Sequence, residues 1–186
     1  MRAPRRGSNR SIPGGYPQAV ANTAVQLHFL RHAHAGDAAK WAAPDFDRPL
    51  SDKGRRQAGA LGAHLEALEL TFDLIVSSPL TRARQTAELV AEQLGMTVAI
   101  DDRLGGMGRG LGISGLEGIL RDHGNPWRPI LVGHDPDFSE LVSRLAGASD
   151  IPMRKGAFAR IDIDRPIQAG AGVLAWLLPP EIIAPV

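Results

Sequence analysis

The 186-residue sequence contains no cysteine, which excludes disulfide bonds, thiolate metal sites and a cysteine nucleophile. It also lacks an apolar run of about 18 residues, so we expect no membrane-spanning segment. The formal net charge is only +1, which gives no support for nucleic acid or an anionic membrane surface as a partner. Any cationic site must therefore be confined to a small part of the protein. The absence of cysteine fits a reducing compartment, and we expect a cytoplasmic protein.

Apolar residues are also scarce in the first 24 positions, which are rich in arginine, glycine, proline, serine and asparagine. Arg5 and Arg6 are followed by a polar segment broken by proline and glycine, not by the apolar stretch of a secretion signal. We interpret residues 1–24 as a disordered tail. The remaining residues, 25–186, are enough for one domain with a substantial core and too few for two.

The rest of the chain alternates between short apolar runs and segments with helical spacing of apolar residues. The runs predict strands at 25–30, 72–77, 97–100, 129–133, 157–163 and 172–178. The helical spacing predicts helices at 51–70, 78–94 and 135–147, the first two with a serine N-cap. This alternation predicts an α/β fold, a three-layer α/β/α sandwich with a mostly parallel central sheet.

The segment from Leu104 to Gly118 holds seven glycines. It is not a dinucleotide-binding fingerprint, because no strand leads directly into a tight GxGxxG turn and a helix. We therefore interpret it as a mobile loop over the edge of the sheet.

Polar residues follow three of the predicted strands where each strand ends. Arg31 and His32 follow the first, Arg82 lies in the first turn of the helix after the second, and His134 follows the fourth. The carboxyl ends of parallel strands meet at one edge, and helix side chains lean toward the helix N-terminus, so we expect these four to converge. Guanidinium groups and helix N-termini both favour phosphate. The sequence thus predicts a phosphate site.

The same residues suggest a reaction. No carboxylate cluster suits Mg²⁺ or Mn²⁺, so we expect neither a metal nor a cofactor. A neutral imidazole is a competent nucleophile toward phosphorus, and His32 would attack through Nε2 to form a phosphohistidine that water later hydrolyses. Arg31, Arg82 and His134 would stabilise the charge of the transferring phosphoryl group.

Four motifs carry a resemblance to a known family. Residues 30–33, 47–54, 77–87 and 132–136 read LRHA, DRPLSDKG, SSPLTRARQTA and VGHDP. In this order and spacing the chain resembles the histidine phosphatase superfamily, with its phosphoglycerate mutase-like fold, and within it the short SixA-type phosphohistidine phosphatases. The resemblance implies that His32 is the phosphorylated nucleophile. It also implies that Arg31, Arg82 and His134 bind the phosphoryl group and that Arg48 contacts a substrate, either a phosphorylated protein or a small phosphorylated molecule.

Two departures from the superfamily bear on the substrate. The sequence has Arg-His-Ala where Arg-His-Gly is typical, which is the SixA-like form. Larger members carry an acidic proton donor after the third strand, and no residue matches it here, which leaves Asp101, Asp102 and Glu117 as candidates. Phosphoramidates are less affected by a missing donor than phosphate monoesters are, because a protonated imidazole leaves without a strong acid.

Two other functions stay open. A phosphoglycerate mutase-like phosphotransferase would need a phosphorylated resting enzyme and an acid donor, and the short chain argues against it. A non-catalytic domain that binds phosphorylated proteins would not need His32 beside two arginines and His134, so the presence of these residues argues against this function. The oligomeric state has no signal in the sequence.

The remaining candidate residues receive structural or surface interpretations. His34 follows His32 at the spacing of some metal sites, but we prefer a position at the rim of the pocket. Arg84 lies on a different helical face from Arg82, so we expect it to be solvated. The other histidines and the tryptophans are expected in the core, at the pocket wall or on the surface: His28, His64, His123, Trp41, Trp127 and Trp176.

Overall fold

Six strands form one sheet in the order β3-β2-β4-β1-β5-β6 in the computed structural model, which describes residues 24–106 and 110–183. The strands are β1 (Val25–Arg31), β2 (Leu74–Ser77), β3 (Val98–Ile100), β4 (Pro129–Gly133), β5 (Phe158–Ile163) and β6 (Val173–Leu178). β1 to β4 are parallel, whereas β5 pairs antiparallel with both β1 and β6. The predicted, mostly parallel sheet is confirmed. The predicted tail, residues 1–24, lies outside the described residues except for its last position.

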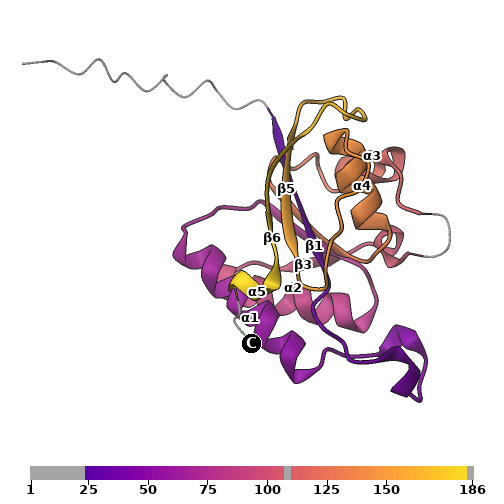
Figure 1. Ribbon diagram of the computed structural model, residues 1–186. Coiled ribbons are helices and arrows are strands. Elements are labelled where there is room, and N and C mark those ends of the chain that lie inside the picture. Colours follow the sequence, from indigo (N-terminus) through magenta and orange to yellow (C-terminus); the bar gives the residue numbers. More distant parts are fainter. Residues whose placement is uncertain (1–23, 107–109, 184–186) are drawn as a thin grey trace, which may run out of the picture.

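Helices cover both faces of this sheet. They are α1 (Asp52–Ala67), α2 (Thr81–Leu94), α3 (Ile113–Asp122), α4 (Asp137–Ala146) and the short α5 (Pro180–Ile183). Figure 1 shows α1, α2 and α5 on one side of the sheet and α3 and α4 on the other. The α/β/α arrangement predicted from the alternation of strands and helices is therefore confirmed.

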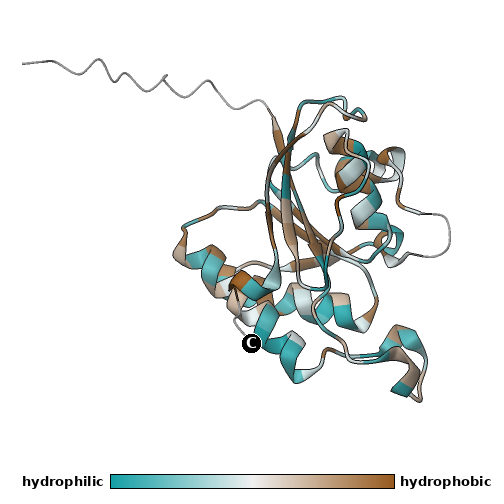
Figure 2. Ribbon diagram, in the orientation of Figure 1, coloured by the Kyte–Doolittle hydropathy of each residue, from teal (hydrophilic) through white to brown (hydrophobic). Residues whose placement is uncertain are grey.

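Two hydrophobic clusters hold these layers together. On one face, Phe29 of β1 packs with residues of α3 and α4, including Phe138, whose ring centroid lies 5.4 Å from that of Phe29. On the other face, Leu30 packs with residues of α1 and α2 such as Leu61. Side chains alternate between the two faces of a strand, so β1 is apolar on both, and the strands are the most hydrophobic part of Figure 2.

The register of the parallel strands places their carboxyl ends side by side. Arg31 lies opposite Gly133, and Ser77 lies opposite Val132. The segments that follow β1, β2 and β4 therefore leave the sheet at the same edge. Ser51 caps α1 as predicted, since its Oγ accepts a hydrogen bond from the N–H of Gly54.

Two predicted elements differ from the structure. α2 begins at Thr81 and not at Ser78, because Ser78 Oγ accepts the N–H of Leu80 and bonds to His134, which makes a turn before the helix. The glycine-rich segment is not one long loop. It contains the end of the 3-10 helix η3 (Asp102–Gly105) and the first half of α3, while residues 107–109 lie outside the described residues.

No helix in the described part of the chain combines the length and the hydropathy needed to cross a membrane.

Candidate active site

His32 follows β1 and is held by the backbone of the next residue. Its Nδ1 lies 2.8 Å from the carbonyl oxygen of Ala33. A carbonyl oxygen only accepts, so Nδ1 carries the proton and Nε2 keeps its lone pair. The side chain is buried, with 5% of its surface exposed. This geometry presents Nε2 as the nucleophilic atom.

Ala33 is fixed in turn by α2. Its N–H donates to Oγ1 of Thr86 at 3.1 Å, and that hydroxyl donates to the carbonyl of Arg82 at 2.7 Å. The backbone of Gly156 adds a second support, because its N–H donates to the carbonyl oxygens of Arg31 and His32. The orientation of the His32 ring therefore depends on three separate segments of the chain.

His134 follows β4 and lies beside His32, with 5.1 Å between the ring centroids. Its Nε2 is 2.8 Å from Ser78 Oγ, which already accepts the N–H of Leu80. The hydroxyl proton of Ser78 is thus free to bond to Nε2, an arrangement that places the imidazole proton of His134 on Nδ1.

Arg82 and Arg48 share a carboxylate. Asp45, on the 3-10 helix η2 (Asp45–Asp47), lies 3.1 Å from Arg82 Nη1 and accepts a hydrogen bond from Arg48 Nε at 2.8 Å. Arg82 Nη1 also donates to the backbone carbonyl of Asp45, and Arg48 Nη1 to that of Ala35. Both arginines are 7% exposed, so each is fixed in position by these contacts.

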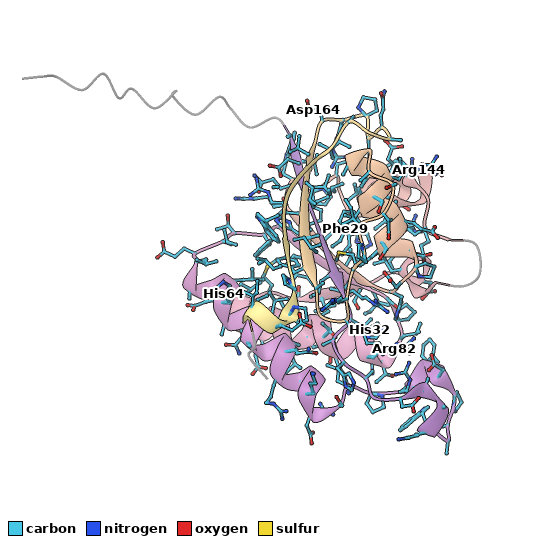
Figure 3. All side chains as sticks on the ribbon, in the orientation of Figure 1. Phe29, His32, His64, Arg82, Arg144 and Asp164 are labelled. Atoms are coloured by element: carbon cyan, nitrogen blue, oxygen red, sulfur yellow. The ribbon has the colours of Figure 1, made fainter. Side chains whose placement is uncertain are left out.

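Arg31 completes the cationic group from the end of β1. Its Nη1 donates to Asp135 at 3.1 Å and to the carbonyl of Met153. Asp135 is held by Ser139, whose hydroxyl donates to Oδ1 at 2.7 Å. Figure 3 shows His32 and Arg82 together at one end of the molecule, with Asp164 toward the opposite end.

Three buried nitrogen atoms in this group lack a hydrogen-bond partner among the described residues: Arg31 Nε, Arg82 Nε and His134 Nδ1. Buried polar atoms are nearly always paired, since leaving one unpaired costs about 1 to 3 kcal/mol. All three belong to the residues that the sequence predicts around phosphate. An oxyanion is the kind of ligand that accepts hydrogen bonds from such donors.

Burial also keeps both imidazoles neutral. It lowers the pKa of His32 to about 3, with His134, Arg82 and Arg31 as further causes. It lowers the pKa of His134 to about 4, helped by the charges of Arg82 and Arg31. At neutral pH the imidazole of His32 is therefore unprotonated, the state in which an imidazole is nucleophilic.

The candidate proton donors make hydrogen bonds to residues other than His32. Asp101 accepts from Arg103 Nε at 2.8 Å and Nη2 at 2.6 Å, and these bonds lower the pKa of the carboxyl group. Glu117 accepts the N–H of Ile167 at 3.1 Å, and Asp102 is exposed on η3. Asp101, held as a carboxylate by Arg103, is therefore a poor proton donor.

His34 and Arg84, the two other polar residues considered from the sequence, make local contacts. His34 Nδ1 bonds to Ser51 Oγ at 2.7 Å, and burial lowers the pKa of His34. Arg84 pairs with Glu88 on the exposed face of α2. Within residues 24–106 and 110–183, no three His, Asp or Glu side chains are arranged to hold a metal ion.

Sequence reasoning missed three residues of this site. Ser78 and Thr86 lie inside the SSPLTRARQTA motif, but the sequence indicates only a helix N-cap for Ser78 and no site role for either residue. Asp45 had a local signal, since it stands three residues before Arg48, a spacing at which opposite charges meet within a turn. The contact of Asp45 with Arg82 joins residues 37 positions apart, and no local pattern in the sequence indicates it.

Comparison with known proteins identifies the family. The sequence model of the histidine phosphatase superfamily (branch 1) matches residues 27–125. The chain belongs to the histidine phosphatase superfamily. The resemblance drawn from the four motifs is thus confirmed, and solved SixA structures are among its structural neighbours.

The relatives found by sequence comparison carry different names. An uncharacterized protein of Picosynechococcus sp. is 39% identical over 129 residues, which are 66% of this chain and 73% of that protein. The "Probable phosphoglycerate mutase GpmB" of Cronobacter sakazakii is 32% identical over 133 residues, or 67% of this chain. The match spans 61% of the length of GpmB.

Solved structures agree on the fold. The protein histidine phosphatase SixA, complexed with tungstate, superposes with a TM-score of 0.69 and 25% identity over 83% of this chain and 97% of SixA. The alpha-ribazole phosphatase from Shigella flexneri gives a TM-score of 0.63 at 19% identity, over 83% of this chain and 96% of that phosphatase, which supports the fold alone.

Proposed function

We propose that this protein is a metal-independent phosphatase that works through a phosphohistidine formed at His32. The observation that carries the proposal is the Nδ1 hydrogen bond to Ala33, which leaves Nε2 unprotonated beside three unpartnered nitrogens of Arg31, Arg82 and His134. The absence of cysteine fits action in the reducing cytoplasm.

The proposed reaction has two steps. Nε2 of His32 attacks phosphorus, a P–N bond forms, and the bond from phosphorus to the leaving group breaks. Water then attacks the phosphohistidine, so the P–N bond breaks and inorganic phosphate is released. Arg31, Arg82 and His134 donate hydrogen bonds to the phosphoryl oxygens, where negative charge is greatest in the transition state.

The proposed substrates are phosphohistidine in a protein or a small phosphorylated molecule. Among the described residues, none of the three candidate acids is hydrogen-bonded to His32, and phosphohistidine depends least on such a donor, because its imidazole leaves in protonated form. The similarity to SixA, a protein histidine phosphatase, supports the same choice. A phosphoglycerate mutase-like reaction is the second candidate, supported by the similarity to GpmB.

The test is turnover of a phosphohistidine peptide, 4-nitrophenyl phosphate and 3-phosphoglycerate by the purified protein. We expect phosphate release that persists in EDTA, a base-stable phosphoenzyme after rapid quenching, and loss of both in His32→Ala. Phosphate transfer within 3-phosphoglycerate without release would identify a mutase instead. Binding of the peptide without turnover would identify a phosphoprotein-binding domain.

A matched pair of variants tests the phosphate pocket. Arg82→Ala should lower kcat/KM by at least about tenfold, since one preorganised donor contributes on the order of 2 to 4 kcal/mol to transition-state stabilisation. Arg84→Ala removes the same charge from the exposed face of α2 and should leave kcat/KM unchanged. Equal effects of the two variants would show that Arg82 does not face the phosphoryl group.

A further inference from the structure

A cavity lies near the amino-terminal ends of β1, β2 and β4, at the opposite edge of the sheet from the phosphate pocket. It has a volume of about 210 Å³, and its wall includes Gln26, His28, Phe72, Arg128 and Trp176 among others. His28 stands four residues before His32, which is about 13 Å along an extended strand. The cavity is therefore separate from the proposed active site.

His28 presents an unused hydrogen-bond acceptor to this cavity. Its Nδ1 lies 3.1 Å from the carbonyl oxygen of Pro129, which only accepts, so Nδ1 carries the proton. Nε2 then keeps a lone pair and has no hydrogen-bond partner among the described residues. Only 3% of the surface of His28 is exposed, and burial lowers the pKa of the imidazole to about 4. A ligand in the cavity would satisfy Nε2 with an N–H donor.

Aromatic rings surround this imidazole. The ring centroid of Phe72 lies 4.9 Å from that of His28, and the centroid of Trp176 lies 5.8 Å from it. Both rings also line the cavity. Proteins bind unpaired nucleobases by stacking them on such side chains. A cavity of about 150 Å³ holds benzene, so a cavity of about 210 Å³ suits two fused rings.

The charged groups around the cavity balance one another. Arg160, which lines it, binds both carboxylate oxygens of Asp162 through Nε and Nη2, at 2.6 and 2.8 Å. Arg128 and Glu69, which carry opposite charges, also line the wall. The cavity thus offers hydrogen-bond donors and acceptors without an excess of either charge, and this combination favours a neutral ligand that both donates and accepts.

We propose that this cavity binds a purine base, with an N–H group of the base donating to Nε2 of His28 and the fused rings packed against Phe72 and Trp176. A purine is planar, neutral and bicyclic, and its edges carry both donors and acceptors. The base itself is recognised, so a purine nucleoside binds without a phosphoryl group. The inference concerns binding alone and does not depend on the proposed phosphatase reaction.

Titration calorimetry with nucleosides tests this site, because a nucleoside has no phosphoryl group for the active site. The probes are adenosine, guanosine and uridine, added to the purified full-length protein. We expect one of the two purine nucleosides to bind with a dissociation constant of about 1 mM or lower, and at least about fivefold more tightly than uridine, which has a single ring. An excess of inorganic phosphate should leave this affinity unchanged, since the two sites are separate.

Variants assign the binding to the cavity. Trp176→Leu should weaken purine binding at least about fivefold, because a stacking surface is lost. Trp127→Leu is the matched control, since Trp127 is 54% exposed and does not line the cavity, and it should keep the affinity. His28→Phe keeps a ring but removes Nε2, and it should also weaken binding. Thermal unfolding of each variant establishes that it is folded.

Four outcomes would overturn the inference: no measurable binding of either purine nucleoside, equal affinity for uridine, displacement of the purine by phosphate, or equal losses in Trp176→Leu and Trp127→Leu. The first three are measured on the unmodified protein, so they hold even where a variant does not fold. The phosphatase proposal fails on different evidence, since a protein that binds purines as expected but forms no phosphoenzyme would retain this site without the proposed reaction.

Discussion

The backbone N–H of Ala33 donates to the hydroxyl of Thr86 at 3.1 Å, which links the residue that orients His32 to the turn of α2 that carries Arg82. One buried hydroxyl thus couples the proposed nucleophile to one of the proposed phosphate ligands. The distance in sequence between Ala33 and Thr86 is 53 residues, so only the folded chain makes this connection.

Thr86→Val should lower both stability and turnover. Valine has nearly the same shape but no acceptor, so the buried N–H of Ala33 loses its partner at a cost of about 1 to 3 kcal/mol of unfolding free energy. The His32 ring should also lose its fixed orientation, and we expect kcat to fall more than KM changes. Urea denaturation and steady-state kinetics measure the two effects. Thr81→Val, in the first turn of the same helix, is the control, and an unchanged kcat in Thr86→Val would refute the link.

Asp45→Asn should tighten binding of inorganic phosphate. The Asp45 carboxylate occupies donors of Arg48 and Arg82, and these contacts lower its pKa, so it competes with an incoming anion as a carboxylate. An amide at this position competes less, and we expect the inhibition constant for phosphate to fall about fivefold. Asp47→Asn, in the same turn, is the control. Weaker phosphate inhibition in Asp45→Asn would mean that Asp45 positions the arginines and does not compete.

Stability should decrease as the pH falls from 6.5 toward 4. Burial lowers the pKa of His28 to about 4, of His32 to about 3 and of His134 to about 4, whereas in the unfolded chain these groups titrate near 6.5. The unfolded state therefore binds more protons in this window, and protonation favours unfolding. Each histidine contributes a slope of up to about 1.4 kcal/mol per pH unit.

Urea denaturation at several pH values between 7 and 4 measures this slope. His28→Phe provides an internal check, because His28 packs among Phe72, Phe158 and Trp176, outside the site. The variant should lose about one third of the slope. A slope that stays the same would show that His28 is not a source of the pH dependence.

Gly54→Ala should destabilise the protein strongly. A Cβ at this position would lie 2.0 Å from the carbonyl oxygen of His34, which is itself bonded to the N–H and hydroxyl of Ser51. Gly59, in the same helix, has no atom within 4 Å of a built Cβ. Gly59→Ala should therefore stabilise the protein by about 0.5 to 1 kcal/mol, as a helix normally gains from this exchange. Thermal unfolding of both variants tests the contrast, and similar shifts in Tm would contradict it.

The sheet, and the edge of the sheet that carries the site residues, were predictable because they depend on local sequence patterns. Apolar runs in β1 and β4 are buried on both faces, and the polar residue that ends each run is visible without knowledge of the fold. The convergence of Arg31, His32, Arg82 and His134 follows from the parallel sheet. The family motifs strengthen that prediction.

The start of α2 and the existence of α3 were not predictable in the same way. Two glycines, at 115 and 118, lower the helix propensity of the α3 segment, although Leu116, Ile119 and Leu120 show helical spacing and are fully buried. Packing against the sheet outweighs propensity there. Contacts such as Asp45 with Arg82 and Gly156 with His32 depend on loop paths that no local pattern encodes.

The direction of β1 has a practical consequence for handling this protein. The strand enters the sheet at Val25 and delivers His32 after seven residues, so the two ends are separated by roughly 20 Å at about 3.3 Å per residue. A fusion partner or surface linker joined ahead of Ala24 is attached at the border of the molecule remote from the pocket. Immobilisation through a linker placed directly before Ala24 should therefore leave the imidazole of His32 open to substrates in solution.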